Sequence, residues 1–99
     1  MAFPLIIEPE AEDDLANAYD WYEEQRPGLG IDFLNCIEDV FRRLRVTPEM
    51  HAVVHNNVRQ TLVKRFPYVV CYTVDEECVY VVAVFHGQRD PNAWKSRSR

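Results

Sequence analysis

Apolar side chains recur at helical spacing in the first half of the chain and at strand spacing in the second half. Ala11, Leu15, Ala18 and Tyr22 fall at i, i+4, i+7 and i+11, which is the stripe of an amphipathic helix. Pro9 suits the first turn of this helix, and Arg26-Pro27-Gly28 ends it and turns the chain. The pattern therefore predicts a helix that begins at Pro9 and stops just before this turn.

A second apolar stripe predicts another helix over residues 30–45, which Thr47-Pro48 ends. The turn between the two helices is so short that they must pack as an antiparallel hairpin. The apolar positions of the second stripe are Phe33, Leu34, Ile37, Val40, Phe41 and Leu44.

From residue 58 onward the apolar period shortens to that of β-strands. VRQTLVK alternates weakly, while YVVCYTV and CVYVVAVF are rich in β-branched and aromatic residues. Residues 75–77 supply the turn between these last two strands, and FPLIIE at residues 3–8 predicts one more strand at the start. Residues 49–57 read as an exposed loop.

These elements predict one α+β domain over residues 1–99, in the order β-α-α-β-β-β. The continuous apolarity of the last strand places it in the middle of a mostly antiparallel four-stranded sheet, with the first strand beside it. We expect the helical hairpin to pack on one face of this sheet. Residues 90–97 are expected to form a short C-terminal helical turn.

The charge is divided unevenly along the chain. Residues 1–57 hold twelve acidic residues against four arginines, for a net charge of −8, whereas residues 58–99 have a net charge of +3. A sequence pI near 5.1 argues against non-specific nucleic-acid binding by the whole molecule. The start of the chain does not read as a signal peptide, and no apolar run is long enough to span a membrane, so a cytoplasmic location is expected. Cys36, Cys71 and Cys78 form no metal-binding or paired motif, which favours reduced thiols.

Candidate chemistry gathers where the last strand ends, in VVAVFHGQRDPNAW at residues 81–94. His86 could be a proton donor or simply a hydrogen-bonded surface histidine. Arg89 could hold a phosphate or belong to the turn that Asp90-Pro91 forms at the start of a helix. The pattern leaves both pairs of alternatives open.

Two longer stretches resemble toxins of the RelE/ParE superfamily from bacterial type II toxin–antitoxin systems. LVKRFPYVVCYTVDEECVYVVAVFHGQRDPNAW, at residues 62–94, is similar to the second half of these toxins, and AEDDLANAYDWYEEQRPGLGIDFL, at residues 11–34, is similar to their helical hairpin. The resemblance implies a small toxin that a cognate antitoxin protein wraps and silences. RelE-like members are ribosome-dependent endoribonucleases that cut messenger RNA, whereas ParE-like members inhibit DNA gyrase.

This chain lacks several of the cationic residues that are typical of the RelE-like branch. That branch typically has lysines along its second strand and an arginine just after the aromatic residue that Tyr68 matches. Here Gln60 and Leu62 stand at two lysine positions and Val69 follows Tyr68, although Lys64 keeps a cation. Arg89 matches a late arginine of the pattern, and Trp94 stands where a C-terminal tyrosine is common. These departures favour the ParE-like branch.

The resulting expectation is a plasmid-stabilisation toxin that inhibits DNA gyrase by protein binding and is neutralised by its antitoxin. One alternative is an mRNA endoribonuclease acting at the ribosome, and another is a degenerate antitoxin-binding module; a homodimer is also possible. No cofactor or metal is expected, because His51 and His55 have no third ligand spaced to join them. The candidate catalytic residues of the nuclease alternative are His86, Arg89 and Lys64, and the candidate partner-binding residues are Arg59, Arg65, Tyr68 and Trp94.

Overall fold

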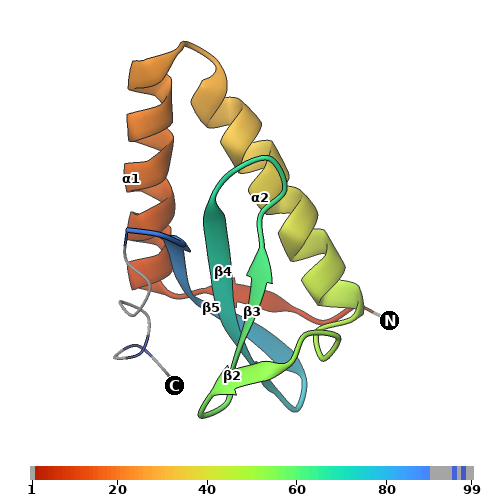
Figure 1. Cartoon of the computed structure of the whole chain (residues 1–99). Helices are drawn as coiled ribbons and strands as arrows, with labels where there is room; N and C mark the ends of the chain where they lie inside the picture. Colours follow the sequence, from red (N-terminus) through yellow and green to blue (C-terminus); the bar gives the residue numbers. More distant parts are fainter. Residues whose placement is uncertain (1, 90–94, 96, 98–99) are drawn as a thin grey trace.

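A computed structural model describes residues 2–89, 95 and 97 of the chain. Two helices pack against a mixed sheet (Figure 1). The helices are α1 (Pro9–Gln25) and α2 (Leu29–Val46), and the strands are β1 (Leu5–Ile7), β2 (Val53–His55), β3 (Val58–Leu62), β4 (Tyr68–Asp75) and β5 (Cys78–His86). The α+β class and the packing of the helical hairpin on the sheet are confirmed.

The sheet has five strands in the order β1-β5-β4-β3-β2. β1 runs parallel to β5, and every other neighbouring pair is antiparallel. The predicted position of the N-terminal strand beside the last strand is therefore confirmed. The prediction of a loop over residues 49–57 is wrong at β2, which adds a fifth strand to the predicted four. This strand is only three residues long and both its valines are exposed, so it lacks the alternating pattern that identifies a half-buried strand.

The helical hairpin depends on two glycines of the PGLG turn. Gly28 precedes α2 with φ of 91°, a left-handed conformation that glycine adopts without steric cost. Gly30 lies where the helices meet, because a Cβ atom there would come within 2.8 Å of the Tyr19 backbone oxygen. The Gly30 backbone N–H also donates to the Glu23 carboxylate at 2.8 Å. The turn therefore fixes how closely α2 approaches α1.

The core lies between the helices and the sheet. Its centre is a cluster of aromatic rings contributed by α1, α2, β4 and the turn before β4, with the centroids of neighbouring rings 5.0–6.0 Å apart. Edge-to-face and tilted packing of this kind adds to the burial energy of the rings. The cluster comprises Tyr22, Phe33, Phe66 and Tyr68. Tyr68 thus has its ring in the core, while its hydroxyl reaches the site described below.

The three cysteines are free thiols, as predicted, and Cys36 and Cys71 are buried. Burial raises the pKa of the Cys71 thiol to about 12, which makes it a poor nucleophile. Neither of the two described helices is long and apolar enough to cross a membrane. The predicted C-terminal helical turn and Trp94 lie outside the described residues, apart from residues 95 and 97.

Candidate functional site

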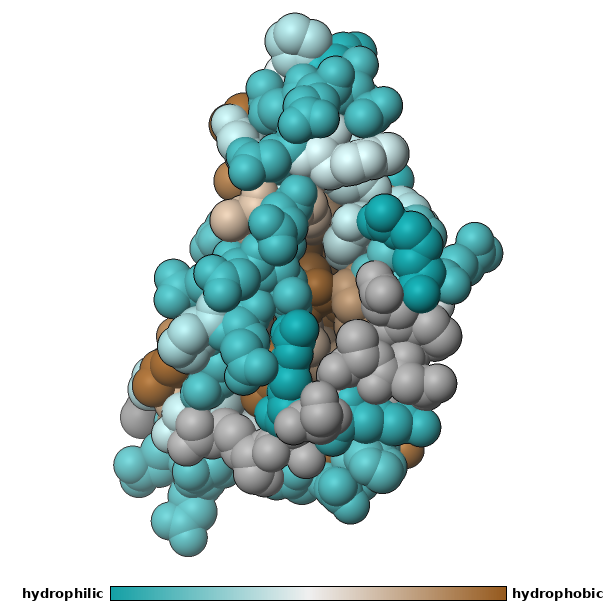
Figure 2. All heavy atoms as spheres, turned by 90° about the vertical axis from the view of Figure 1, so that its left-hand side faces the viewer, coloured by the Kyte–Doolittle hydropathy of each residue, from teal (hydrophilic) through white to brown (hydrophobic). Residues whose placement is uncertain are grey.

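A cleft of about 450 Å³ opens between α1 and the end of β5. Figure 2 views the molecule from the α1 side, where an apolar hollow lies between hydrophilic side chains. Helix α1 contributes one wall, and Tyr68, the end of β5 and the turn after it contribute the other. The lining residues that carry polar or aromatic groups are Asp14, Asn17, Trp21, Tyr68, His86, Arg89 and Arg97.

Strand pairing brings Tyr68 and His86 together in this cleft. They are directly opposite each other in the β4–β5 ladder, and their ring centroids are 5.5 Å apart. The Nδ1 atom of His86 accepts hydrogen bonds from the backbone N–H groups of Gln88 at 3.2 Å and Arg89 at 3.3 Å. These bonds shape the turn after β5 and leave Nε2 as the ring nitrogen for a ligand.

Arg89 lies between helix α1 and the sheet. Its Nη2 donates to the Tyr68 hydroxyl at 3.0 Å, and its guanidinium carbon lies 5.8 Å from the ring centroid of Trp21. The Trp21 side chain is 47% exposed, although it belongs to a helix whose other aromatic residues pack inward. Burial raises the pKa of Tyr22 beneath this group, the Tyr68 hydroxyl raises it further, and Arg89 opposes the shift. The guanidinium is therefore held in place by a hydrogen bond and a cation–π contact.

The floor of the cleft contains an ion pair that connects residues far apart in the sequence. The Asp14 carboxylate accepts from the Val84 backbone N–H at 2.9 Å and from Arg97 Nη1 at 2.5 Å. Arg97 also lies 3.7 Å from the Glu10 carboxylate. The hydrogen bond to Asp14 raises the pKa of Arg97, because it stabilises the charged guanidinium. Asp14 thus joins α1 to β5 and to Arg97.

The structure brings together some of the candidate residues and separates others. His86, Arg89 and Tyr68 share the cleft, whereas Lys64 and Arg65 are exposed on the turn between β3 and β4 and do not line it. That turn lies at the same end of the sheet as the cleft, since the Gly87 N–H donates to the Pro67 carbonyl at 2.9 Å. Trp94 lies outside the described residues.

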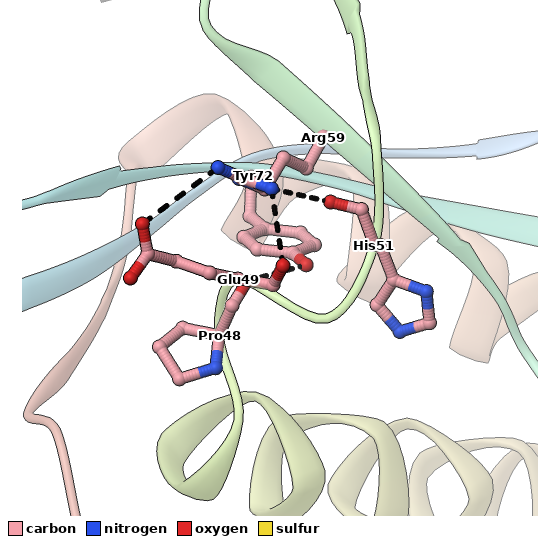
Figure 3. Close-up of polar contacts among 5 residues, drawn as sticks. All are labelled: Pro48, Glu49, His51, Arg59 and Tyr72. Carbon is pink, nitrogen blue, oxygen red and sulfur yellow. Dashed lines mark hydrogen bonds and ion pairs between the residues drawn. The ribbon is translucent and has the colours of Figure 1, made fainter.

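Arg59 lies elsewhere and is committed to bonds within the molecule (Figure 3). Its Nη1 donates to the backbone carbonyls of His51 at 2.5 Å and Glu49 at 3.3 Å, and its side chain is 19% exposed. The neighbouring Tyr72 hydroxyl donates to the Pro48 carbonyl at 2.8 Å. Both side chains satisfy carbonyl groups of the loop between α2 and β2, so this cluster holds the loop on the sheet.

Sequence reasoning did not single out Trp21, Asp14 or Arg97. A signal was present for Trp21, because this large aromatic residue of α1 directly precedes Tyr22 but is not a member of the apolar stripe that faces the core. No local signal identifies Asp14 and Arg97, since they are 83 positions apart and meet only in the folded chain.

Comparison with known proteins agrees with this architecture. The model of the ParE toxin of type II toxin–antitoxin systems (parDE) matches residues 5–91. Toxin ParE2 of Mycobacterium tuberculosis, in strain H37Rv and in strain CDC 1551, is 31% identical over 90 residues, which cover 90% of this chain and 86% of the relative.

Two solved structures have the same fold. The chromosomal ParDE toxin–antitoxin system from P. aeruginosa contains a chain that matches with a TM-score of 0.75 at 17% identity, covering 86% of this chain and 96% of that one. A mutant of the E. coli toxin RelE in the free state matches with a TM-score of 0.69 at 15% identity, covering 98% and 94%. The match of the family model and the extent of the ParE2 similarity show that the chain belongs to the ParE toxin family of type II toxin–antitoxin systems.

Proposed function

We propose that this ParE-family toxin inhibits DNA gyrase by binding it, and that a cognate antitoxin neutralises the toxin. The observation that supports binding over RNA cleavage is a sheet face without charge. Gln60 lies opposite Cys71 in the β3–β4 ladder, Leu62 lies opposite Val69, and Val69 lies opposite Phe85 of β5. Side chains directly opposite each other share a face of the sheet. These five residues define the neutral sheet face; Cys71 and Phe85 are buried in it, whereas Gln60, Leu62 and Val69 are accessible.

The neutral sheet face includes the positions where the resemblance to RelE-like nucleases calls for cations. Cleavage of RNA without a metal needs positive charge around the crowded phosphate and groups that move protons. Gln60, Leu62 and Val69 supply neither, and Lys64 lies on a separate turn. The RNA-cleaving alternative keeps only His86 and Arg89 as a proton donor and a phosphate clamp in the cleft. The arrangement therefore favours a surface for protein binding.

The cleft has the composition of a protein-binding hot spot. Trp, Tyr and Arg are the residue types that contribute most to protein–protein affinity, and Trp21, Tyr68 and Arg89 are in contact there. Arg89 is oriented before any partner arrives, so binding loses little side-chain entropy. We assign the gyrase contact to this cleft.

The antitoxin contact is assigned to the cationic residues of the second half of the chain. Lys64 and Arg65 extend from the β3–β4 turn, at the same end of the sheet as Arg89. A partner with acidic side chains would complement this end of the molecule. Helix α1, whose first turn carries Glu10 and Glu12, is then expected to face away from the antitoxin.

Two assays on one preparation test the proposal. Purified toxin should inhibit DNA supercoiling by gyrase and should leave message on translating ribosomes uncut. W21A and R89A should each raise the inhibitory concentration at least about tenfold, because truncation of a hot-spot residue costs about 2 kcal/mol or more. R42A is the matched control, since Arg42 is an exposed arginine of α2 that pairs with Asp39.

The other outcomes identify the alternatives. Cleaved message that disappears in R89A would establish the nuclease and refute gyrase inhibition. If neither assay responds and expression of the chain does not slow bacterial growth, the chain is a degenerate antitoxin-binding module.

Circular dichroism of W21A checks that loss of the 5.1 Å ring contact with Tyr22 has not unfolded α1.

A further inference from the structure

The outer edge of the sheet exposes apolar side chains that lie outside the cleft. β2 is the last strand on its side of the sheet. Its Val53 and Val54 are 47% and 52% exposed, Leu62 of the neighbouring β3 is 73% exposed, and Met50 before β2 is 60% exposed. We call these four residues the β2 apolar edge. Exposed apolar residues at a strand edge favour association with another chain, and two of these four, Val54 and Leu62, line one groove.

A groove continues from this edge onto the neutral sheet face. It has a volume of about 460 Å³, and Val54, Leu62 and Val69 supply much of its apolar lining, with Gln60 beside them. The groove therefore lies next to a sheet edge and is shaped to receive side chains from an added strand, since successive residues of such a strand point to alternate faces.

The charge pattern points to a second copy of the chain as the occupant. Residues 50–58 contain no Asp, Glu, Lys or Arg, although these four residue types make up 27% of the chain and its net charge is −5. A two-fold axis places each surface against itself, so a dimer through a charged surface brings like charges together, whereas a dimer through residues 50–58 does not. An acidic antitoxin would gain no electrostatic energy from this neutral surface.

We propose that the chain self-associates through antiparallel pairing of β2 with β2 of a second copy. The two five-stranded sheets would then form one continuous sheet, and the two β2 apolar edges would cover each other. Only three residues of β2 can pair, so the dimer is weak and depends on concentration. β3 and β4 separate β2 from β5, so the cleft beside β5 stays open in each copy of the dimer. The inference is thus independent of the target that the cleft binds.

Sedimentation equilibrium of the full chain, from about 1 µM to about 500 µM, tests the proposal. The wild-type chain should shift from monomer to dimer, and V54K and L62K should each raise the dissociation constant by about tenfold or more, because pairing would bury an ammonium group. I31K is the matched control, since Ile31 is 50% exposed on α2, away from the β2 apolar edge. All three positions are exposed, and circular dichroism verifies that the variants are folded.

A wild-type chain that remains monomeric over the whole range would overturn the proposal. A dimer that persists in V54K and L62K but is lost in I31K would overturn it as well, because the interface would then lie on the helices. Amide chemical shifts give an independent readout. Those of residues 50–62 should change with concentration, while those of α1 residues in the cleft should not.

Discussion

Removal of the Asp14 carboxylate is the sharpest test of the connection between α1, β5 and Arg97. D14A deletes the acceptor of two hydrogen bonds, one from the Val84 backbone N–H and one from the Arg97 guanidinium. It leaves a strand N–H without its acceptor and, among the residues that the structure describes, leaves Arg97 with the more distant Glu10 as its ionic partner. The change should therefore reduce the free energy of unfolding substantially.

The magnitude follows from the geometry. A hydrogen bond to a charged group contributes about 1.5–3 kcal/mol. The Asp14 and Arg97 side chains are 18% and 22% exposed, so solvent screens their pair less than it screens an ordinary surface ion pair. Because water can still enter the cleft, the lower part of the range applies, and D14A should cost about 2–4 kcal/mol for the two bonds together. D14N keeps an acceptor but loses the charge, so it should cost about half as much.

Urea unfolding followed by far-ultraviolet circular dichroism measures these differences directly. D13N is the matched control, because Asp13 is the exposed neighbour of Asp14 and its replacement should change stability by less than about 0.5 kcal/mol. A double-mutant cycle with R97A isolates the ion pair and should give a coupling of about 1–2 kcal/mol. The reasoning fails if D14A unfolds within about 0.5 kcal/mol of the wild-type chain, or if D13N costs as much as D14A.

Three further predictions concern single positions. Burial raises the pKa of Tyr72 to about 12 from an ordinary value near 10, so the stability that the protonated phenol contributes is complete below about pH 10 and is lost as the pH rises to 12. Urea unfolding at about pH 9 to 12 should show this loss, and Y72F, which also leaves the Pro48 carbonyl without its donor, should reduce the dependence, while Tyr22, whose pKa is also raised, keeps a part of it. G30A should destabilise the hairpin by about 1–3 kcal/mol in thermal unfolding, because its methyl group would meet the Tyr19 side chain and backbone at 2.8 Å; no change would show that the helices can separate cheaply. R65G should leave the fold as stable or more stable by up to about 1 kcal/mol, since Arg65 has φ of 72°, yet it should weaken antitoxin binding in calorimetry; unchanged affinity would remove Arg65 from that contact.

Local patterns were sufficient to predict most of the architecture. The apolar stripes and the PGLG turn identified both helices, because helical spacing and helix-ending residues act within a few positions of one another. The continuous apolarity of CVYVVAVF placed β5 inside the sheet, since a strand covered on both faces excludes polar side chains. β2 escaped the same reasoning, because an exposed three-residue edge strand is held by backbone pairing with β3 and needs no apolar pattern of its own.

The site was decided mainly by tertiary structure. The sequence by itself indicated His86 and Arg89 as residues of interest, and its resemblance to RelE-like toxins added Tyr68 and implied that the cations of that branch are depleted. Only the β4–β5 register placed Tyr68 opposite His86, and only helix packing brought Trp21 under Arg89. The folded chain likewise turned Arg59 inward to hold a loop, although its sequence position looked like that of a surface cation. The physical reason is that periodicity records which face of an element is buried, whereas the meeting of side chains from distant elements depends on register and packing, which no local pattern contains.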